Sequence, residues 1–248
     1  MPRPFVYRPV ALADLADACR QEPVGSREIR GVVLHHTAEP DIALWRHYGN
    51  EKTVRAIYNG HIDRNFRDIG YHLIVLPDGV SAMCRPWWDA GAHASTWNPH
   101  TLGVSMIGNF SPGEEQPTQE QREAVAVILP ALAGRFRFEL DDDYHPGGQG
   151  LGFHRDEPQA IRNGKDCPGS QITKSMVRGW CSGAGSDPEA ESDSPDRPDF
   201  APWAEEAFEA CEAAGILVGY PDGTRRGYQP VTRNELAVVM ARLLRAQE

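Results

Sequence analysis

Two histidines and one cysteine in separate segments of the chain have the side chains that a catalytic zinc site needs. His35 follows the apolar residues of RGVVLHH, His154 lies in GLGFHRDEP, and Cys167 lies in NGKDCPGS. Zinc held by three protein ligands keeps its fourth tetrahedral position for water, whereas structural sites close with four ligands. The chain has nine histidines, and many histidines are core or surface residues, so spacing alone leaves both interpretations open.

Cys167 has a second possible chemistry, as the nucleophile of a thiol hydrolase paired with a histidine. Pro168 and Gly169, which follow it, predict a turn and not the helix N-terminus that would activate a thiolate. We expect no disulfide framework, because the five cysteines are odd in number and scattered. GxSxG, phosphate-loop and dinucleotide motifs are missing from the sequence, which leaves a hydrolase or a binding protein as the candidate classes.

The elements that must position these residues alternate between strands and helices. Thr118 and Gln121 form a capping box before a helix whose apolar residues share one face, Ala124, Val125, Ile128, Leu129 and Leu132. Pro77-Asp78-Gly79 is a turn signal for a hairpin. The apolar patterns predict strands over residues 30–36, 71–76, 80–84 and 103–107 and a helix over residues 51–67. The fold class is therefore α/β, a mixed sheet flanked by helices.

Four motifs in order give this region a family resemblance. The segments VVLHHTAEP, DIGYHLIVLPDG, GAHASTWNPHTLGVSMIGNF, and FHRD followed by KDCPG resemble those of the zinc-dependent N-acetylmuramoyl-L-alanine amidases in the phage lysozyme and peptidoglycan recognition protein superfamily. The resemblance covers residues 31–169. It implies that His35, His154 and Cys167 bind Zn²⁺, that Tyr71 and Lys165 are catalytic, and that peptidoglycan is the substrate. Twelve residues separate His154 from Cys167, more than in compact members, which indicates an insertion before Lys165.

The implied mechanism is hydrolysis of the amide between muramic acid and L-alanine. A zinc-bound water has a pKa lowered from about 15.7 towards about 7, so it can attack the amide carbonyl at neutral pH. Tyr71 would donate a hydrogen bond, and Lys165 would supply positive charge, to the oxyanion that forms. Because residues two apart in an extended segment share a side, we expect Lys165 to face the metal beside Cys167.

Four other polar residues lie beside these motifs. His93, in GAHAS, resembles a family position that lines the substrate cleft, so it is predicted to bind substrate, with core packing as the alternative. Asn98 is predicted to order the same loop and to contribute to substrate binding. His36 and His72 each follow a site residue in a predicted strand. Alternation is therefore expected to turn their side chains to the opposite face, where they either pack or support the site residues.

The chain is expected to have three parts: a catalytic domain over residues 1–182, an acidic linker over residues 183–199 and a small all-α module over residues 200–248. The linker has six acids and one base among Pro, Ser and Gly, a composition that cannot offset the entropy of ordering. FAPWAEEAFEACEAAGILVGYPDG and the following TRNE resemble a single surface-layer homology module. Such modules bind secondary cell-wall polymers, and Arg233 would pair with their anionic groups. One copy is a marginal core, which makes a homo-oligomer plausible.

Composition and charge limit the partners and the cellular location that we expect for this chain. The net charge of −10 and the lack of a basic stripe argue against nucleic acid as a partner. The sequence has no run of about 18 apolar residues, which argues against a membrane span. Asp14 and Asp17 interrupt the start of the chain, so we expect no signal peptide. The pattern favours a phage or prophage endolysin that stays in the cytoplasm until lysis; the alternatives are a non-catalytic peptidoglycan-binding protein of the same fold and a bacterial autolysin.

Overall fold

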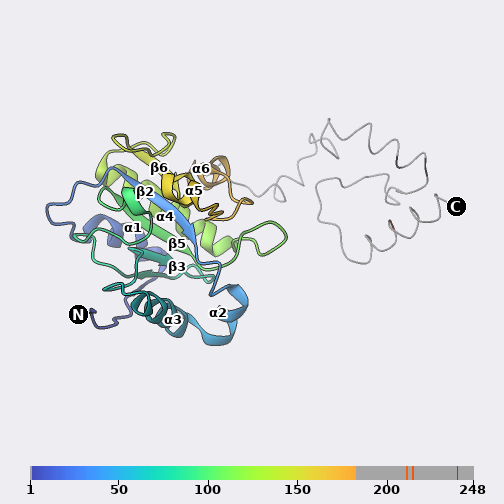
Figure 1. The fold of residues 1–248 in the computed structure, drawn as a ribbon, viewed down its shortest axis with the longest axis horizontal. Helices are drawn as coiled ribbons and strands as arrows, with labels where there is room; N and C mark the ends of the chain where they lie inside the picture. The colour runs from blue at the N-terminus through green and yellow to red at the C-terminus, as the bar shows by residue number, and fades with distance from the viewer. Residues whose placement is uncertain (1, 183–210, 212–213, 215–238, 240–248) are drawn as a thin grey trace. The chain divides into compact units, whose positions relative to one another are not determined.

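A computed structural model describes residues 2–182 together with residues 211, 214 and 239 (Figure 1). The chain divides into two units, Met1–Gly185 and Ser186–Glu248. All the helices and strands whose bounds follow lie in the first unit.

The centre of this unit is a six-stranded mixed sheet with the order β1-β4-β3-β5-β2-β6 (Figure 1). β2 pairs in parallel with both β5 and β6, β3 pairs in parallel with β5, and β4 pairs antiparallel with β3 and β1. The strands are β1 (Pro9–Val10), β2 (Gly31–His36), β3 (Leu73–Val75), β4 (Ser81–Met83), β5 (Thr101–Met106) and β6 (Gly150–Phe153). The predicted mixed sheet is confirmed, and so is the antiparallel hairpin.

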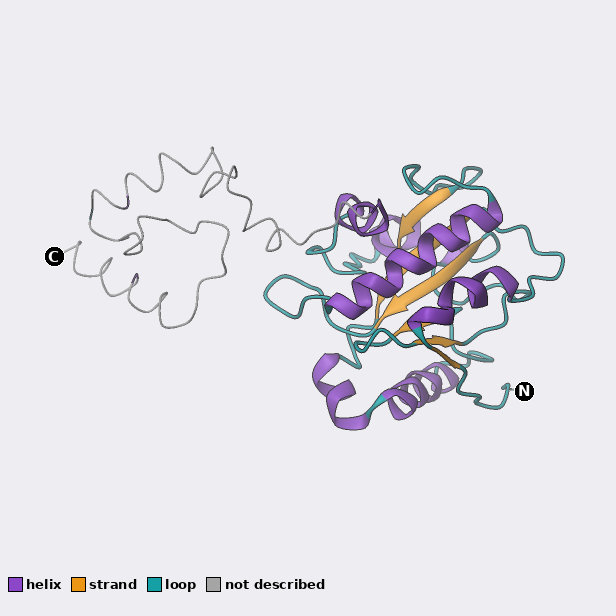
Figure 2. Ribbon diagram, turned by 180° about the vertical axis from the view of Figure 1, so that it is seen from behind, coloured by secondary structure: helices purple, strands orange, loops and turns teal. Residues whose placement is uncertain are grey.

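Helices flank this sheet, as the sequence predicts. Figure 2 shows the longest helix, α4, lying across one face of the sheet. The helices are α1 (Leu12–Gln21), α2 (Ile42–Tyr48), α3 (Asn50–Asp63), α4 (Gln119–Phe136), α5 (Pro158–Arg162) and α6 (Lys174–Ser182), with two 3-10 turns, η1 (Ser95–Trp97) and η2 (His154–Asp156). The capping box of Thr118 and Gln121 is present at the start of α4. The predicted apolar face of α4 is fully buried.

Alternation along β2 divides its side chains between the two faces of the sheet. Val32 and Leu34 pack in the large core with residues of α1, α4 and α6, whereas Val33 belongs to a separate small cluster with Ala94 and Trp97. His35 therefore points to the face opposite α4. α3 contributes Val54 and Ile57 to a third cluster, with residues of β3 and of the segment before it.

Two predicted boundaries differ from the structure. The helix predicted over residues 51–67 ends at Asp63, because Asn65 adopts a left-handed backbone with φ of 63° that an α-helix cannot continue through. The first strand of the hairpin begins at Leu73, so Tyr71 precedes it. No helix among the described residues is long and apolar enough to span a membrane.

Candidate metal centre

Three segments bring His35, His154 and Cys167 together. One possible ligand atom from each lies within 4.8 Å of the other two. His35 is near the end of β2, and His154 follows β6 directly. Because β2 and β6 are neighbouring parallel strands, their carboxyl ends meet at the same edge of the sheet. The loop between α5 and α6 then carries Cys167 to that edge.

The separation of the donor atoms fits a tetrahedral zinc ion. Cys167 Sγ lies 3.5 Å from His35 Nδ1. Bonds of about 2.3 Å to sulfur and about 2.0–2.1 Å to nitrogen, at the tetrahedral angle, place those two donors about 3.6 Å apart. The rings of His35 and His154 are 4.8 Å apart between centroids. The residues predicted as ligands therefore form a group of two imidazoles and one thiol that could hold a metal ion.

The electrostatics of the three donors also suit a cation. Burial lowers the pKa of His35 well below its ordinary value and lowers that of His154, so both imidazoles are neutral and keep a lone pair. Burial raises the pKa of the Cys167 thiol to about 12, although the backbone N–H of His36 donates to Sγ at 3.4 Å. Without a cation, burial thus favours the protonated thiol of Cys167. A divalent cation bound to Cys167 would favour the thiolate instead, since a coordinating thiol loses its proton. The raised pKa argues against Cys167 as a thiol nucleophile.

Tyr71 lies beside the donor set. Its ring centroid is 5.1 Å from that of His35 and 5.5 Å from that of His61. His61 Nδ1 accepts the backbone N–H of Gly70 at 3.0 Å, which fixes the chain at the residue before Tyr71. A side chain at position 70 would collide with the carbonyl oxygen of Ala92, so glycine is required there. Burial raises the pKa of the Tyr71 phenol, which therefore keeps its proton.

Lys165 is exposed in the segment between α5 and Cys167. Among the described residues its ammonium group has no ion pair, but its positive charge lowers the pKa of both His154 and Cys167. The positive charge of Lys165 therefore acts electrostatically on two of the three donors. The predicted insertion before Lys165 contains the short helix α5.

His93 and Asn98 occupy one loop behind His35. His93 is 8% exposed, and its Nδ1 lies 3.0 Å from His35 Nε2. Asn98 Oδ1 accepts the backbone N–H groups of His93 and Ala94 at 3.0 and 2.9 Å. The loop-ordering role of Asn98 is confirmed. Substrate binding by either residue stays a prediction.

His36 packs as predicted, but the ring of His72 lies edge to face with that of His93, which contacts His35, so the prediction that His72 faces away from the site is wrong. Each of the two rings accepts a backbone hydrogen bond. His36 Nδ1 accepts from the N–H of Phe110 at 3.0 Å, and His72 Nδ1 accepts from the N–H of Gly103 at 2.9 Å. Burial lowers their pKa values to about 4 and about 3. Neither ring is in the donor set.

Arg155, which was not predicted from the sequence as a functional residue, holds the Cys167 loop. Its guanidinium donates to the carbonyls of Gly169 and Ile172, both at 2.7 Å. Its backbone N–H donates to the carbonyl of Cys167, also at 2.7 Å. The position directly after His154 in FHRD was the available signal, because a residue next to a ligand in sequence is placed to support the site.

A second missed residue is Glu157, whose carboxylate joins two loops. It is fully buried and accepts from the Thr96 hydroxyl at 2.8 Å and from the backbone N–H groups of Gln159 and Ala160 at 2.8 and 2.9 Å. Glu157 thereby caps α5 and ties it to η1. The proline after Glu157 was a readable signal for the start of a helix, because Pro is favoured at the first helical position.

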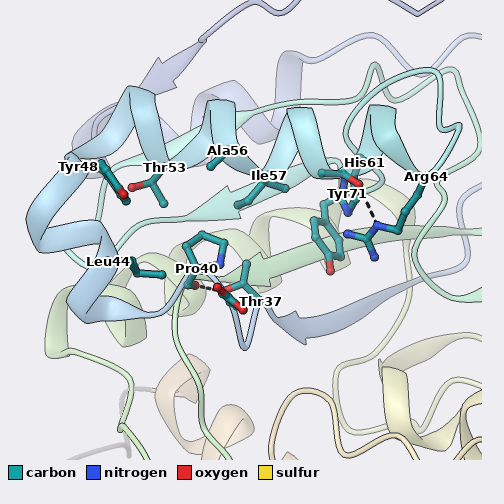
Figure 3. A pocket seen from close by; sticks show the side chains of 12 residues that line it. Thr37, Pro40, Leu44, Tyr48, Thr53, Ala56, Ile57, His61, Arg64 and Tyr71 are labelled. Atoms are coloured by element: carbon teal, nitrogen blue, oxygen red, sulfur yellow. Dashed lines mark hydrogen bonds between the residues drawn. The ribbon is translucent and has the colours of Figure 1, made fainter.

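A cavity of about 510 Å³ adjoins the site. Figure 3 shows α3 on one side of it, Thr37 and Pro40 on the other, and Tyr71 at one end beside His61 and Arg64. The cavity lining carries a negative charge on Glu39 and a positive charge on Arg64. The lining residues are Thr37, Glu39, Pro40, Leu44, Tyr48, Thr53, Ala56, Ile57, Gly60, His61, Arg64 and Tyr71.

The first unit of the chain matches a model of a known protein family. The family model of N-acetylmuramoyl-L-alanine amidase matches residues 25–170, a span that contains all three donors, Tyr71 and Lys165. The chain belongs to this amidase family. The S-layer homology domain model matches residues 195–237, which overlaps the predicted module. Arg233 falls within that match but lies outside the described residues.

Several relatives support the same assignment. An N-acetylmuramoyl-L-alanine amidase of Sus scrofa is 33% identical over 153 residues, covering 59% of this chain and 22% of that protein. Peptidoglycan-recognition protein SC1a of Drosophila melanogaster is 27% identical over 149 residues, covering 60% and 71%. The endolysin amidase LysCS from Clostridium intestinale has a similar solved structure, with a TM-score of 0.50 and 20% identity over 73% of this chain and 94% of that one. This last likeness concerns the fold.

Together these findings identify an amidase-family domain that acts on or binds peptidoglycan, accompanied by an S-layer homology domain of the kind associated with cell walls. All five cysteines are free, as the scattered spacing predicted.

Proposed function

We propose that this member of the amidase family hydrolyses the amide bond between N-acetylmuramic acid and L-alanine, with Zn²⁺ held by His35, His154 and Cys167. The observation that carries the proposal is the convergence of the three donors, with Cys167 Sγ and His35 Nδ1 separated by 3.5 Å. Three protein ligands would leave one tetrahedral position open. When bound, the ion would polarise the amide carbonyl and lower the pKa of a water molecule.

The other residues of the site would act on the substrate directly. Tyr71 keeps its proton, because burial raises the pKa of its phenol, so it would donate a hydrogen bond to the oxygen of the scissile carbonyl as negative charge develops there. Lys165 would add positive charge from the exposed side. Donors fixed in advance at the position of a growing oxyanion lower the activation barrier without reorganising.

The cavity beside Tyr71 would receive the stem peptide. It runs along α3 and ends at Tyr71 (Figure 3), so a peptide lying in it would present its first amide to the donor set. The guanidinium of Arg64 and the carboxylate of Glu39 suit a ligand that carries both charged and apolar groups. The predicted contributions of His93 and Asn98 to substrate binding would come from the loop behind His35.

For the whole chain, we propose a wall-cutting enzyme with a wall-binding module, and an endolysin as its biological role. Residues 1–182 would form the catalytic domain, residues 183–199 a linker, and residues 200–248 the module that binds a secondary cell-wall polymer through Arg233. The S-layer homology match supports wall association. Such an enzyme would stay in the cytoplasm until lysis, and the module could assemble into a homo-oligomer.

Substitution of Cys167 by alanine tests the enzyme proposal. We expect the variant to lose stoichiometric zinc and to release no new L-alanine N-termini from purified sacculi. Cys181→Ala is the matched control, because Cys181 lies in α6 and is not in the donor set; it should keep both properties. Full turnover by Cys167→Ala would remove the metal mechanism. If the wild-type protein bound sacculi but released no N-termini, the result would favour the alternative of a non-catalytic peptidoglycan-binding protein. The relatives of this chain include a peptidoglycan-recognition protein.

A further inference from the structure

The side chain of His93 makes one hydrogen-bond contact within the described part of the chain, and that contact is to a proposed zinc ligand. Its Nδ1 is 3.0 Å from His35 Nε2, and the two rings meet edge to face with centroids 5.0 Å apart. Its other nitrogen, Nε2, is buried without a hydrogen-bond partner among these residues. Among the described residues, His35 is therefore the hydrogen-bond partner of this buried ring.

We propose that His93 is a positioning residue for the metal centre: its Nδ1 accepts the Nε2 proton of His35 and so keeps His35 Nδ1 free for the cation. The inference rests on the proposed function, because it takes His35 as a ligand. It assigns to His93 a role towards the ligand in addition to the predicted role towards the substrate.

The assignment follows from counting protons on the two rings. A histidine that binds a cation through one ring nitrogen keeps its single ring proton on the other nitrogen. His35 Nδ1 is the atom that faces Cys167 Sγ, and a metal there requires its lone pair. The proton of His35 must then sit on Nε2, and His93 Nδ1 must be the acceptor. The reverse arrangement would place the proton of His35 on Nδ1 and block the ion.

The surroundings of His93 hold its ring in this orientation. A side chain at Gly91 would lie 2.6 Å from His93 Nε2, and one at Gly103 would lie 2.9 Å from Nδ1; both glycines therefore leave space that the ring occupies. The ring of His72 lies edge to face with it at 5.7 Å. Asn98 Oδ1 fixes the backbone of His93 at 3.0 Å. The acceptor is thus held from several sides before any ion binds.

Arg27, which is half-buried, anchors the chain on both sides of this loop. Arg27 donates to the carbonyls of Trp87 and Asp89, at 2.8 and 2.9 Å, and to those of Asn98 and Thr101, at 2.9 and 2.7 Å. The segment that carries His93 runs between these two anchored stretches. A fixed partner of this kind sets the tautomer and orientation of a metal-binding histidine.

The zinc dissociation constant tests this role, measured by chelator competition on the full chain. His93→Gln moves the side-chain amide away from the position of Nδ1, and His93→Leu removes the acceptor. We expect both to bind zinc about 10- to 100-fold more weakly than the wild type, the range for loss of such a partner. His93→Asn places a carbonyl oxygen near the position of Nδ1 and should bind zinc more nearly like the wild type. Thermal unfolding of the metal-free proteins reports any loss of stability separately.

His61→Leu is the matched control. His61 is also a buried imidazole that accepts one hydrogen bond, from Gly70 N–H, but it does not contact a proposed ligand, so its loss should leave zinc affinity unchanged. If His93→Leu does not fold, the Asn and Gln variants still decide the matter. Wild-type zinc affinity in His93→Gln, with zinc lost in Cys167→Ala, would overturn the role of His93 and leave the metal site standing. A wild type without stoichiometric zinc would overturn the proposed metal site, and this inference with it.

Discussion

Removal of the phenolic oxygen of Tyr71 separates its chemical role from its packing. Tyr71→Phe keeps the ring, which contacts His35 and His61 with centroids 5.1 and 5.5 Å away. The three proposed zinc ligands are unchanged. The variant should therefore fold, with an unfolding free energy within about 1 kcal/mol of the wild type, the usual net value of one hydrogen bond.

The expected effect falls on turnover. Loss of one preorganised oxyanion donor costs about 10²–10³ in kcat, or about 2.7–4 kcal/mol of activation free energy. A loss within that range is expected here, because the Tyr71 ring lies beside the donor set, with its centroid 5.1 Å from that of His35. KM should change little, since the hydrogen bond would strengthen mainly in the transition state.

The assay is release of new L-alanine N-termini from a soluble muramoyl peptide, with kcat and KM determined separately and zinc content measured on the same samples. Tyr58→Phe is the matched control. The Tyr58 hydroxyl donates to the carbonyl of Arg3 at 2.5 Å and does not line the cavity, so its removal should leave kcat unchanged. A Tyr71→Phe variant within about twofold of wild-type kcat would refute the oxyanion role, given the magnitude expected for such donors.

Three other perturbations have defined outcomes. Lys165→Ala should lower kcat by about 10²-fold with zinc content retained, and unchanged kcat would refute its charge-stabilising role. Deletion of residues 200–248 should reduce pelleting with cell walls but preserve cleavage of the soluble substrate; unchanged pelleting would reject the anchoring role. Metal-free protein should lose stability as the pH falls from about 6.5 towards 4, because burial lowers the pKa of His61 to about 4 and the unfolded chain binds a proton there first. The loss is up to about 3 kcal/mol for this residue, and His61→Phe should show a smaller pH dependence in urea unfolding; an equal one would contradict the assignment.

Local patterns in the sequence correctly indicated four strands, β2 to β5, and two helices, α3 and α4. The apolar run before His35 predicted β2, and the capping box at Thr118 predicted the start of α4. Alternation placed His36 on the opposite face from His35, because successive side chains of a strand point to opposite sides. β6 was not predicted, since GLGF is short and has two glycines. The end of α3 was placed too late, because the left-handed backbone of Asn65 leaves no periodic signal.

The identities of His35, His154 and Cys167 could be read from the order of the motifs, but their meeting point could not. Cys167 Sγ and His35 Nδ1 are 132 residues apart in sequence, and the pairing of β2 with β6 brings His154 to the same edge. Periodicity specifies which way a side chain faces within one element. It does not specify which elements become neighbours.

The sequence by itself therefore determined the family, the donor types and the faces of the individual strands and helices. Only the tertiary structure decided that His93 lies behind His35, that Arg155 and Glu157 hold the loops around the donor set, and that a cavity along α3 ends at Tyr71. These relations join atoms from distant segments, and they arise when the segments pack against one sheet, so no single stretch of sequence contains them.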